Sequence, residues 1–360
     1  MRVAILIRRF STRGGNERQA FELARHLCGA GHDVHVHCHK ADETAALPGA
    51  HVHVLPGIRF DPTAAMLSYA WSTRRLVRRL RSEDRIDRVI GFGQSVEQDV
   101  YRLGGGTHAE FLVATKDHPG ARGGPVLDRV ALRLERIRLR PERSPHLVAP
   151  SHRVADELVR HYGVATDRIH VVWNGTDLER FQTGPAEDLG WRDERPLALF
   201  VGQDPHRKGF DIAAEATRRL GARLVYVGRG DRPARLPDHV LWAGERRDME
   251  RVYRAADVLI APSRYDPFGG VVLEAAACGR ASVATRRIGA TERFAETPLD
   301  ALLVEDPEDV DGVTRALESA LADHDALGAA ARAAVADASI QAWGERMVVV
   351  LSLPIPERVR

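Results

Sequence analysis

The sequence predicts an α/β protein with two doubly wound parallel sheets. Short apolar segments of strand length recur, as at residues 3–7 and 197–201, and turns and helical periodicity follow them. Such alternation is typical of parallel sheets, which bind ligands at the carboxyl ends of their strands. The 360 residues suggest two domains, because domains often have about 150 residues.

Composition indicates a globular protein without a general affinity for nucleic acid. The chain is 44% hydrophobic and 28% charged, and its formal net charge is only +2. The three cysteines, Cys28, Cys38 and Cys278, form no Cys-x-x-Cys pair, which favours a reducing, cytoplasmic location. No apolar run approaches the length of a membrane-spanning helix, and the N-terminal apolar run is too short for a signal peptide.

Residues 257–274 predict a phosphate-binding turn. An apolar strand is followed by Gly269 and Gly270 and then by a helix, and the free N–H groups of a helix N-terminus attract an anion. Glu274 lies about two turns into that helix, where a carboxylate suits the hydroxyls of a ribose. The alternative is a solvated glutamate on an ordinary α/β unit.

A basic turn follows the strand at residues 197–201. Arg207 and Lys208 precede a helix expected at about residues 211–220. If both turns follow strands of one sheet, these cations lie beside the Gly269 turn, where they would neutralise a diphosphate. A solvated basic turn is the alternative.

The N-terminal half contains weaker candidates. Gly14 and Gly15 precede a helix at about residues 17–29; they either bring backbone amides close to an anion or only form a tight turn. Asp99 and His108 lie in glycine-rich segments after the strand expected at residues 86–92, so they are candidates for ligand contact. Composition alone favours the alternative for each, an ordinary surface loop residue or a cap.

Three alternating histidines raise the question of a metal site. His35, His37 and His39 share one face of an expected strand, but metal sites need convergent ligands and supporting hydrogen bonds. The sequence shows neither, so we predict no metal site. The Gly228-Arg-Gly230 segment lacks the third glycine of a dinucleotide fingerprint, which argues against NAD binding.

Several of these segments resemble the family 4 retaining glycosyltransferases. The resemblance is carried by an acidic residue and a glutamate, Asp266 and Glu274, separated by seven residues around a Phe-Gly turn, and by the segment Gly202-Gln-Asp-Pro-His-Arg-Lys-Gly209. The Gly14-Gly15 turn followed by Gly31-His-Asp-Val adds to it. Asp266 stands where the family usually has glutamate, and Gly279-Arg-Ala replaces Gly-x-Pro.

The resemblance implies the GT-B fold, with two facing Rossmann-like domains and a cleft between them. The N-terminal domain would contain residues 1–173 and 339–360 and bind the acceptor. The C-terminal domain, residues 174–338, would bind the nucleotide sugar. The implied donor-binding residues are Gly14, Gly15, His108, Arg207, Lys208, Gly244, Asp266, Phe268, Gly269, Gly270 and Glu274.

Within the family, the segment around Asp99 is similar to the lipopolysaccharide core glucosyltransferases that act on heptose. This similarity implies transfer of a hexose, most often glucose from UDP-glucose, to a saccharide or glycolipid acceptor. It makes Asp99 a catalytic candidate beside the acceptor, together with Arg207, Lys208 and Asp266. No metal cofactor is expected, because the two cations replace a divalent ion. A nucleotide-sugar epimerase of the same architecture is the alternative.

A basic amphipathic segment suggests a surface for an anionic membrane. It begins at Arg122, ends at Arg143, and carries apolar residues at helical spacing between arginines. It would hold the enzyme peripherally at the cytoplasmic face of the inner membrane. In the competing interpretation, the apolar stripe packs against the N-terminal domain and the arginines are solvated or bind acceptor phosphates.

Overall fold

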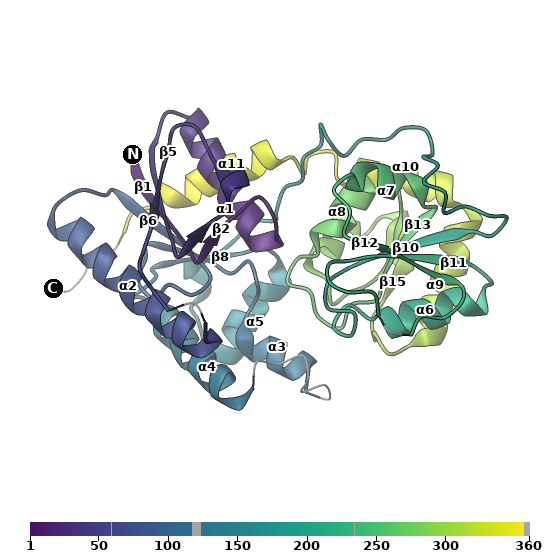
Figure 1. Cartoon of the computed structure of the whole chain (residues 1–360), viewed down its shortest axis with the longest axis horizontal. Helices are drawn as coiled ribbons and strands as arrows, with labels where there is room; N and C mark the ends of the chain where they lie inside the picture. The colour runs from purple at the N-terminus through teal and green to yellow at the C-terminus, as the bar shows by residue number, and fades with distance from the viewer. Residues whose placement is uncertain (59, 117–123, 234, 356–360) are drawn as a thin grey trace. The chain divides into compact units, whose positions relative to one another are not determined.

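The computed structural model describes residues 1–58, 60–116, 124–233 and 235–355, and the chain divides into two compact units (Figure 1). The first unit contains Met1–Asn174 and Ile340–Arg360, and the second contains Gly175–Ser339. The chain therefore passes from the first unit to the second and returns at its end. The boundaries differ by one residue from those expected from the sequence.

The first unit is built on a seven-stranded parallel sheet with the order β5-β3-β1-β6-β7-β8-β9. A two-stranded parallel pair, β2-β4, accompanies it. The strands are β1 (Arg2–Ile7), β2 (Arg9–Phe10), β3 (Asp33–Cys38), β4 (Lys40–Ala41), β5 (Ala50–Val54), β6 (Arg88–Phe92), β7 (Val100–Arg102), β8 (His146–Ala149) and β9 (Ile169–Val171).

Helices cover both faces of this sheet. They are α1 (Gly15–Gly29), α2 (Pro62–Ser82), α3 (His108–Ala114), α4 (Pro125–Arg138), α5 (His152–Tyr162) and α11 (Ile340–Leu351), with short 3-10 helices η1 (Glu43–Ala45) and η3 (Thr166–Arg168). On one face, Val3 and Ile5 share a core with residues of α1 and α11. On the other, Ala4 and Leu6 pack with Val77 of α2. Figure 1 shows α11, in yellow, beside α1.

The second unit has a six-stranded parallel sheet with the order β12-β11-β10-β13-β14-β15. Its strands are β10 (Leu197–Val201), β11 (Arg223–Val227), β12 (Val240–Gly244), β13 (Val258–Ala261), β14 (Ser282–Thr285) and β15 (Leu303–Val304). Its helices are α6 (Phe210–Arg219), α7 (Met249–Ala255), α8 (Gly270–Ala277), η4 (Gly289–Phe294), η5 (Pro298–Leu302), α9 (Val310–Ala322) and α10 (His324–Ala334).

Most of the basic amphipathic segment forms helix α4. Its first two residues, Arg122 and Gly123, fall outside the described residues. The apolar stripe of α4 packs against Met66, Ala70 and Val96 of the same unit. This stripe consists of Leu127, Val130, Ala131, Leu134 and Ile137. Ala131 and Leu134 are buried and the other three are partly buried, so the stripe contributes to the core of this unit. Among the described residues, no helix combines the length and apolar composition needed to cross a membrane.

Candidate active site

Two glycine-capped helices begin at neighbouring strands of the second unit. Strand β10 leads to α6 through Gly209, and its hydrogen-bonded neighbour β13 leads to α8 through Gly269. Both glycines are left-handed, with φ of 74° and 76°. A Cβ on Gly209 would lie 2.1 Å from the carbonyl oxygen of Pro262, and one on Gly269 would lie 2.4 Å from Ile288 Cγ2. Glycine is therefore required at both caps, and two helix N-termini open at the same edge of the sheet.

Three charged side chains gather beside these caps. Lys208 Nζ forms an ion pair with Asp266, and Arg207 Nη1 donates to the carbonyl oxygen of Tyr265 at 2.7 Å. Asp266 is only 8% exposed. Burial alone would raise its pKa, but the charges of Lys208 and Arg207 more than offset this and lower it. The structure thus brings together the predicted residues of two motifs that lie 58 residues apart in the sequence.

Arg264 holds the basic turn in place, although no sequence pattern pointed to this residue. Its Nη1 donates to the carbonyl oxygen of His206, and its backbone N–H donates to that of Arg207 at 2.9 Å. The guanidinium also pairs with Asp211 and Glu308, and these hydrogen bonds raise its pKa although burial acts in the opposite direction. A permanently charged side chain therefore fixes the backbone that presents the two cations.

Glu274 lies on α8, whose N-terminus opens at this edge. Its Oε2 accepts a hydrogen bond of 2.8 Å from the hydroxyl of Tyr253 on α7. Tyr253 is fully buried, whereas Glu274 is partly exposed. The tyrosine thereby orients a carboxylate that solvent or a ligand can reach.

The other predicted residues of the second unit lie at the same strand edge. Phe268 is buried, and its N–H donates to Asp266 Oδ1 at 3.3 Å. Gly270 begins α8, and a Cβ there would meet nothing within 4 Å. Gly244 ends β12, two strands from β10. Its neighbour Trp242 packs edge-on against Tyr226 with ring centroids 4.6 Å apart.

In the first unit, Gly14 caps α1 with a φ of 91°, and Gly15 is the first residue of that helix. The next residue, Asn16, accepts a hydrogen bond of 3.1 Å from Arg102 Nη1. Arg102 ends β7, is 1% exposed, and also donates to Asn174 Oδ1. Its guanidinium lies over the rings of Phe92 and Trp343. Burial lowers the pKa of Arg102 to about 9.

Comparison with known proteins identifies the family. A model described as Glycosyltransferase Family 4 matches residues 13–180, and one described as Glycosyl transferases group 1 matches residues 195–323. A probable transglycosylase of Burkholderia thailandensis is 31% identical over 341 residues, which cover 89% of this chain and 88% of that protein. The chain belongs to the group 1 and family 4 glycosyltransferases. Other curated relatives match over about half of their length or less.

Solved structures show the fold of this glycosyltransferase. WaaG, a glycosyltransferase involved in lipopolysaccharide biosynthesis, has a TM-score of 0.80 at 20% identity, covering 98% of this chain and 100% of that one. Anabaena HepE in complex with UDP-glucose has a TM-score of 0.72 at 18% identity, covering 98% and 99%. The two parallel-sheet α/β domains are therefore those of the GT-B fold.

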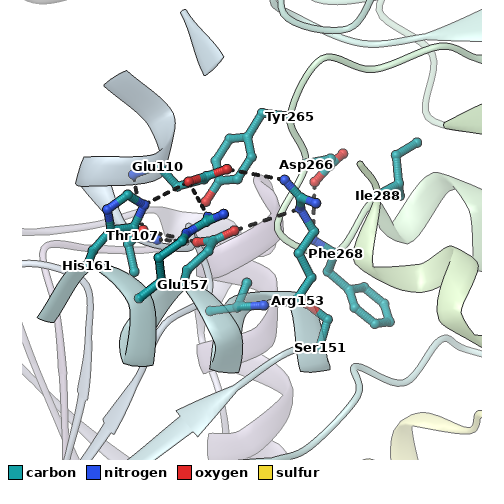
Figure 2. A network of polar contacts seen from close by, with 12 residues as sticks. Thr107, Glu110, Ser151, Arg153, Glu157, His161, Tyr265, Asp266, Phe268 and Ile288 are labelled. Atoms are coloured by element: carbon teal, nitrogen blue, oxygen red, sulfur yellow. Dashed lines mark hydrogen bonds and ion pairs between the residues drawn. The ribbon is translucent and has the colours of Figure 1, made fainter. Parts of the chain in front are cut away.

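His108 is the first residue of α3 in the glycosyltransferase, and its surroundings are strongly charged. Its Nε2 lies 3.1 Å from Asp128 Oδ1, and its backbone N–H donates to Glu135. Figure 2 shows Arg153 and His161 directed at Glu110 of the same helix, and their nitrogens lie 3.3 and 2.8 Å from its carboxylate oxygens. Burial alone would raise the pKa of Glu110, but His161, Arg160 and Arg153 lower it.

Asp99 lies at the opposite edge of the first unit's sheet from the Gly14 turn. It precedes β7, and its Oδ2 accepts from the N–H of Val89 near the start of β6 at 2.7 Å. Its Oδ1 accepts from Arg81 at 2.7 Å, and the residue is 3% exposed. Asp99 is thus at the amino-terminal edge of the sheet, whereas Gly14 and Arg102 lie at the carboxyl edge. The partly buried ion pair with Arg81 of α2 and the hydrogen bond from Val89 indicate a structural role for Asp99.

Proposed function

We propose that this glycosyltransferase moves a hexosyl group from a nucleoside diphosphate sugar to a saccharide acceptor, retaining the anomeric configuration. The observation that carries the proposal is the pair of cations, Arg207 and Lys208, beside two glycine-capped helix N-termini. Positive charge and free N–H groups at one edge suit a diphosphate that leaves with the negative charge. UDP-glucose is the proposed donor, since the fold relative HepE binds it.

The site residues of the second unit would then each have a role in binding or catalysis. Lys208 and Arg207 stabilise the charge that develops on the leaving diphosphate, as a point charge and as a planar fork. Asp266 holds Lys208 in place, and Arg264 fixes the turn behind both cations. Glu274, oriented by Tyr253, accepts hydrogen bonds from the ribose hydroxyls. Gly244 marks the strand end where the nucleotide base would lie.

The proposed acceptor is a saccharide, with lipopolysaccharide core heptose as the first candidate. The fold of WaaG supports this choice, and the first unit would bind the acceptor. Gly14 and Gly15 would admit the donor sugar close to the backbone. His108, held by Asp128, would position a sugar hydroxyl near the transferred group.

The direct test is product analysis with a panel of UDP-glucose, UDP-galactose and GDP-mannose, with and without heptose-terminated core oligosaccharide. We expect UDP release from UDP-glucose that requires the acceptor, and an α-linked product by NMR, since the donor is the α-anomer. An inverted linkage would contradict retention. Nucleotide sugar converted to its epimer without any acceptor would overturn the transferase assignment for this chain.

We further propose that the protein works in the cytoplasm and associates peripherally with an anionic membrane surface. Since the apolar stripe of α4 packs within the first unit, the attraction would come mainly from the exposed arginines of this helix and its C-terminal end. These are Arg129, Arg133, Arg136 and Arg140. The neighbouring α2 exposes Trp71, which is 64% accessible and suits the membrane interface. Each such arginine contributes about 1 kcal/mol near an anionic leaflet.

Liposome co-sedimentation checks the membrane proposal. We expect binding to phosphatidylglycerol vesicles at low salt that exceeds binding to neutral vesicles and is lost at high salt. Changing Arg129, Arg133 and Arg136 to Glu should abolish it. The matched control changes three exposed arginines of the second unit, Arg218, Arg229 and Arg315, in the same way. Equal losses in both triple variants would show that only net charge matters.

A further inference from the structure

Four histidines form an array on the outer strands of the first unit. Strands β3 and β5 pair in parallel register, with His35 beside His51 and His37 beside His53. The rings stack at centroid separations of 4.9 Å for the first pair and 4.7 Å for the second. All four side chains stand on one face, because residues two apart in a strand point to the same side. His39 is not part of the array, since its Nε2 lies 3.3 Å from Ser72 Oγ.

Asp33 adds a carboxylate to this array. Its Oδ1 lies 3.1 Å from His35 Nε2 and 3.8 Å from His51 Nε2. One ligand atom from each of these three residues lies within 4.8 Å of the other two. In a tetrahedral Zn²⁺ site, with bonds of about 2.0–2.2 Å, ligand atoms are about 3.3–3.6 Å apart. The separations from the carboxylate oxygen bracket this range, so modest side-chain rotations would complete a three-ligand site.

His53 supplies the supporting contact that metal-bound histidines normally have. Its Nε2 lies 3.0 Å from His35 Nδ1. If Nδ1 carries the proton of His35 and donates it to His53, the lone pair of Nε2 faces Asp33 and is available to a metal. The next histidine inward, His37, is 5% exposed and stacks on His53, so the array continues from the exposed strand start into the unit.

We propose that Asp33, His35 and His51 bind a divalent transition-metal ion of the Zn²⁺, Ni²⁺ or Cu²⁺ class, with His53 orienting His35. Two imidazoles and one carboxylate suit these ions better than Mg²⁺ or Ca²⁺, which prefer oxygen ligands. The fourth position is open to water, since the side chains of His51 and Asp33 are 64% and 46% exposed. The site is independent of the proposed transfer reaction, whose residues lie at other strand ends.

Such an ion would link the edge strand of the sheet to its neighbour. Among the described residues, strand β5 is the outer strand of the sheet and pairs with β3 alone. The ligands come from both strands: Asp33 and His35 from β3, and His51 from β5. A bound metal would therefore cross-link the edge strand to its neighbour and stabilise the folded state by mass action. The expected signs are a higher Tm and slower hydrogen exchange of the β5 amides.

A second histidine pair serves as an internal control. His146 Nδ1 and His170 Nε2 lie 3.1 Å apart on neighbouring strands β8 and β9, which form the other end of the sheet. His146 Nε2 contacts the carbonyl oxygen of Pro354 at 2.9 Å. Within the described ranges, neither histidine forms an ion pair with a carboxylate. This pair thus has an imidazole–imidazole contact like that of the proposed site, but it lacks a carboxylate ligand such as Asp33.

The test is calorimetric titration of untagged, chelator-stripped full-length protein with ZnCl₂, supported by native mass spectrometry. We expect one ion per chain and a Zn²⁺-dependent rise in Tm. His51→Asn and Asp33→Asn, both at exposed positions, should weaken binding at least tenfold, while His170→Asn leaves it unchanged. Circular dichroism establishes that each variant is folded.

Three results would overturn the proposal. These are no stoichiometric Zn²⁺ binding by the wild-type chain, unchanged affinity in His51→Asn, or an equal loss of affinity in His170→Asn. Protection of the β5 amides distinguishes an ion held between the strands from one held by a single surface histidine. Transfer activity is not the readout, so failure here leaves the proposed function standing.

Discussion

Each unit places a cation beside a glycine-capped helix at the carboxyl edge of its sheet, but the two cations have different partners. In the second unit, Lys208 faces the carboxylate of Asp266. In the first, Arg102 is buried and donates to the neutral amide oxygens of Asn16 and Asn174. Its Nε has no hydrogen-bond partner among the described residues.

We propose that this difference separates a ligand-binding cation from a positioning one. Lys208, paired with a carboxylate at the carboxyl edge of the sheet, would exchange part of that pairing for a diphosphate. Arg102 instead joins three segments within its own unit: the glycine turn through Asn16, the last residue before the chain leaves the unit through Asn174, and α11, on which the chain returns, through Trp343. We therefore expect changes at Lys208 to affect chemistry, and changes at Arg102 to affect stability first.

The largest effect is expected for Lys208→Met, which removes the charge and keeps most of the apolar stem. Turnover should fall by about 10²–10³-fold, as when one stabilising donor is lost from a transition-state site. Rates under saturating donor, measured by UDP release, provide the check. Arg218→Met, an exposed arginine on α6, is the matched control. Comparable activity of Lys208→Met and wild type would contradict a role for Lys208 in the transfer reaction.

Glu274→Ala should weaken donor binding by about 1.5–3 kcal/mol, the usual contribution of hydrogen bonds to a charged group. The fold should remain intact because the carboxylate is partly exposed. Calorimetry with UDP measures the effect. Tyr253→Phe, which loses only the hydroxyl that orients Glu274, should show a smaller decrease in affinity. The ribose role would be refuted by an Ala variant that binds UDP as tightly as wild type.

Arg102→Met tests whether Arg102 stabilises the first unit. It leaves two asparagine oxygens without their donor, so the free energy of unfolding should fall by about 1–3 kcal/mol. Chemical denaturation measures this loss. Arg88→Met is the control, because Arg88 also anchors the end of α11, through the carbonyl oxygen of Leu351, and does not contact the glycine turn. If Arg102→Met retained full stability, Arg102 would have to be reconsidered as a ligand-binding residue.

The sequence predicted best what is local along the chain. The alternation of strands and helices, and the glycines at the helix caps, follow from neighbouring residues. The two motifs of the second unit could be brought together because parallel strands end at one edge. Arg102 escaped detection because its partners lie 86 and 72 residues away, and nothing in its own neighbourhood marks it.

Two other features show the same limit. The loop before Asp99 runs back across the sheet to the amino-terminal edge. The sequence indicates that a loop follows the strand, but it does not indicate to which edge of the sheet the loop leads. The three alternating histidines led to a prediction of no metal site, because one strand alone offers no convergent ligands. His51, which completes the proposed site, lies on the adjacent strand β5, and the pairing of β5 with β3 is not visible in the sequence around the three histidines.

The smallest effect is expected from chelation: EDTA should leave turnover unchanged. Lys208 and Arg207 supply the positive charge that a divalent ion would otherwise bring to the diphosphate. Asp309 and Asp311 have the Asp-x-Asp spacing that can hold a divalent ion, but both make other contacts. Asp309 caps α9 through the N–H of Gly312, and Asp311 pairs with Arg219. Turnover lost in EDTA and restored by Mg²⁺ or Mn²⁺ would contradict this prediction. Assays below the Tm of the metal-stripped protein keep the outcome separate from any stabilisation by an ion at Asp33, His35 and His51.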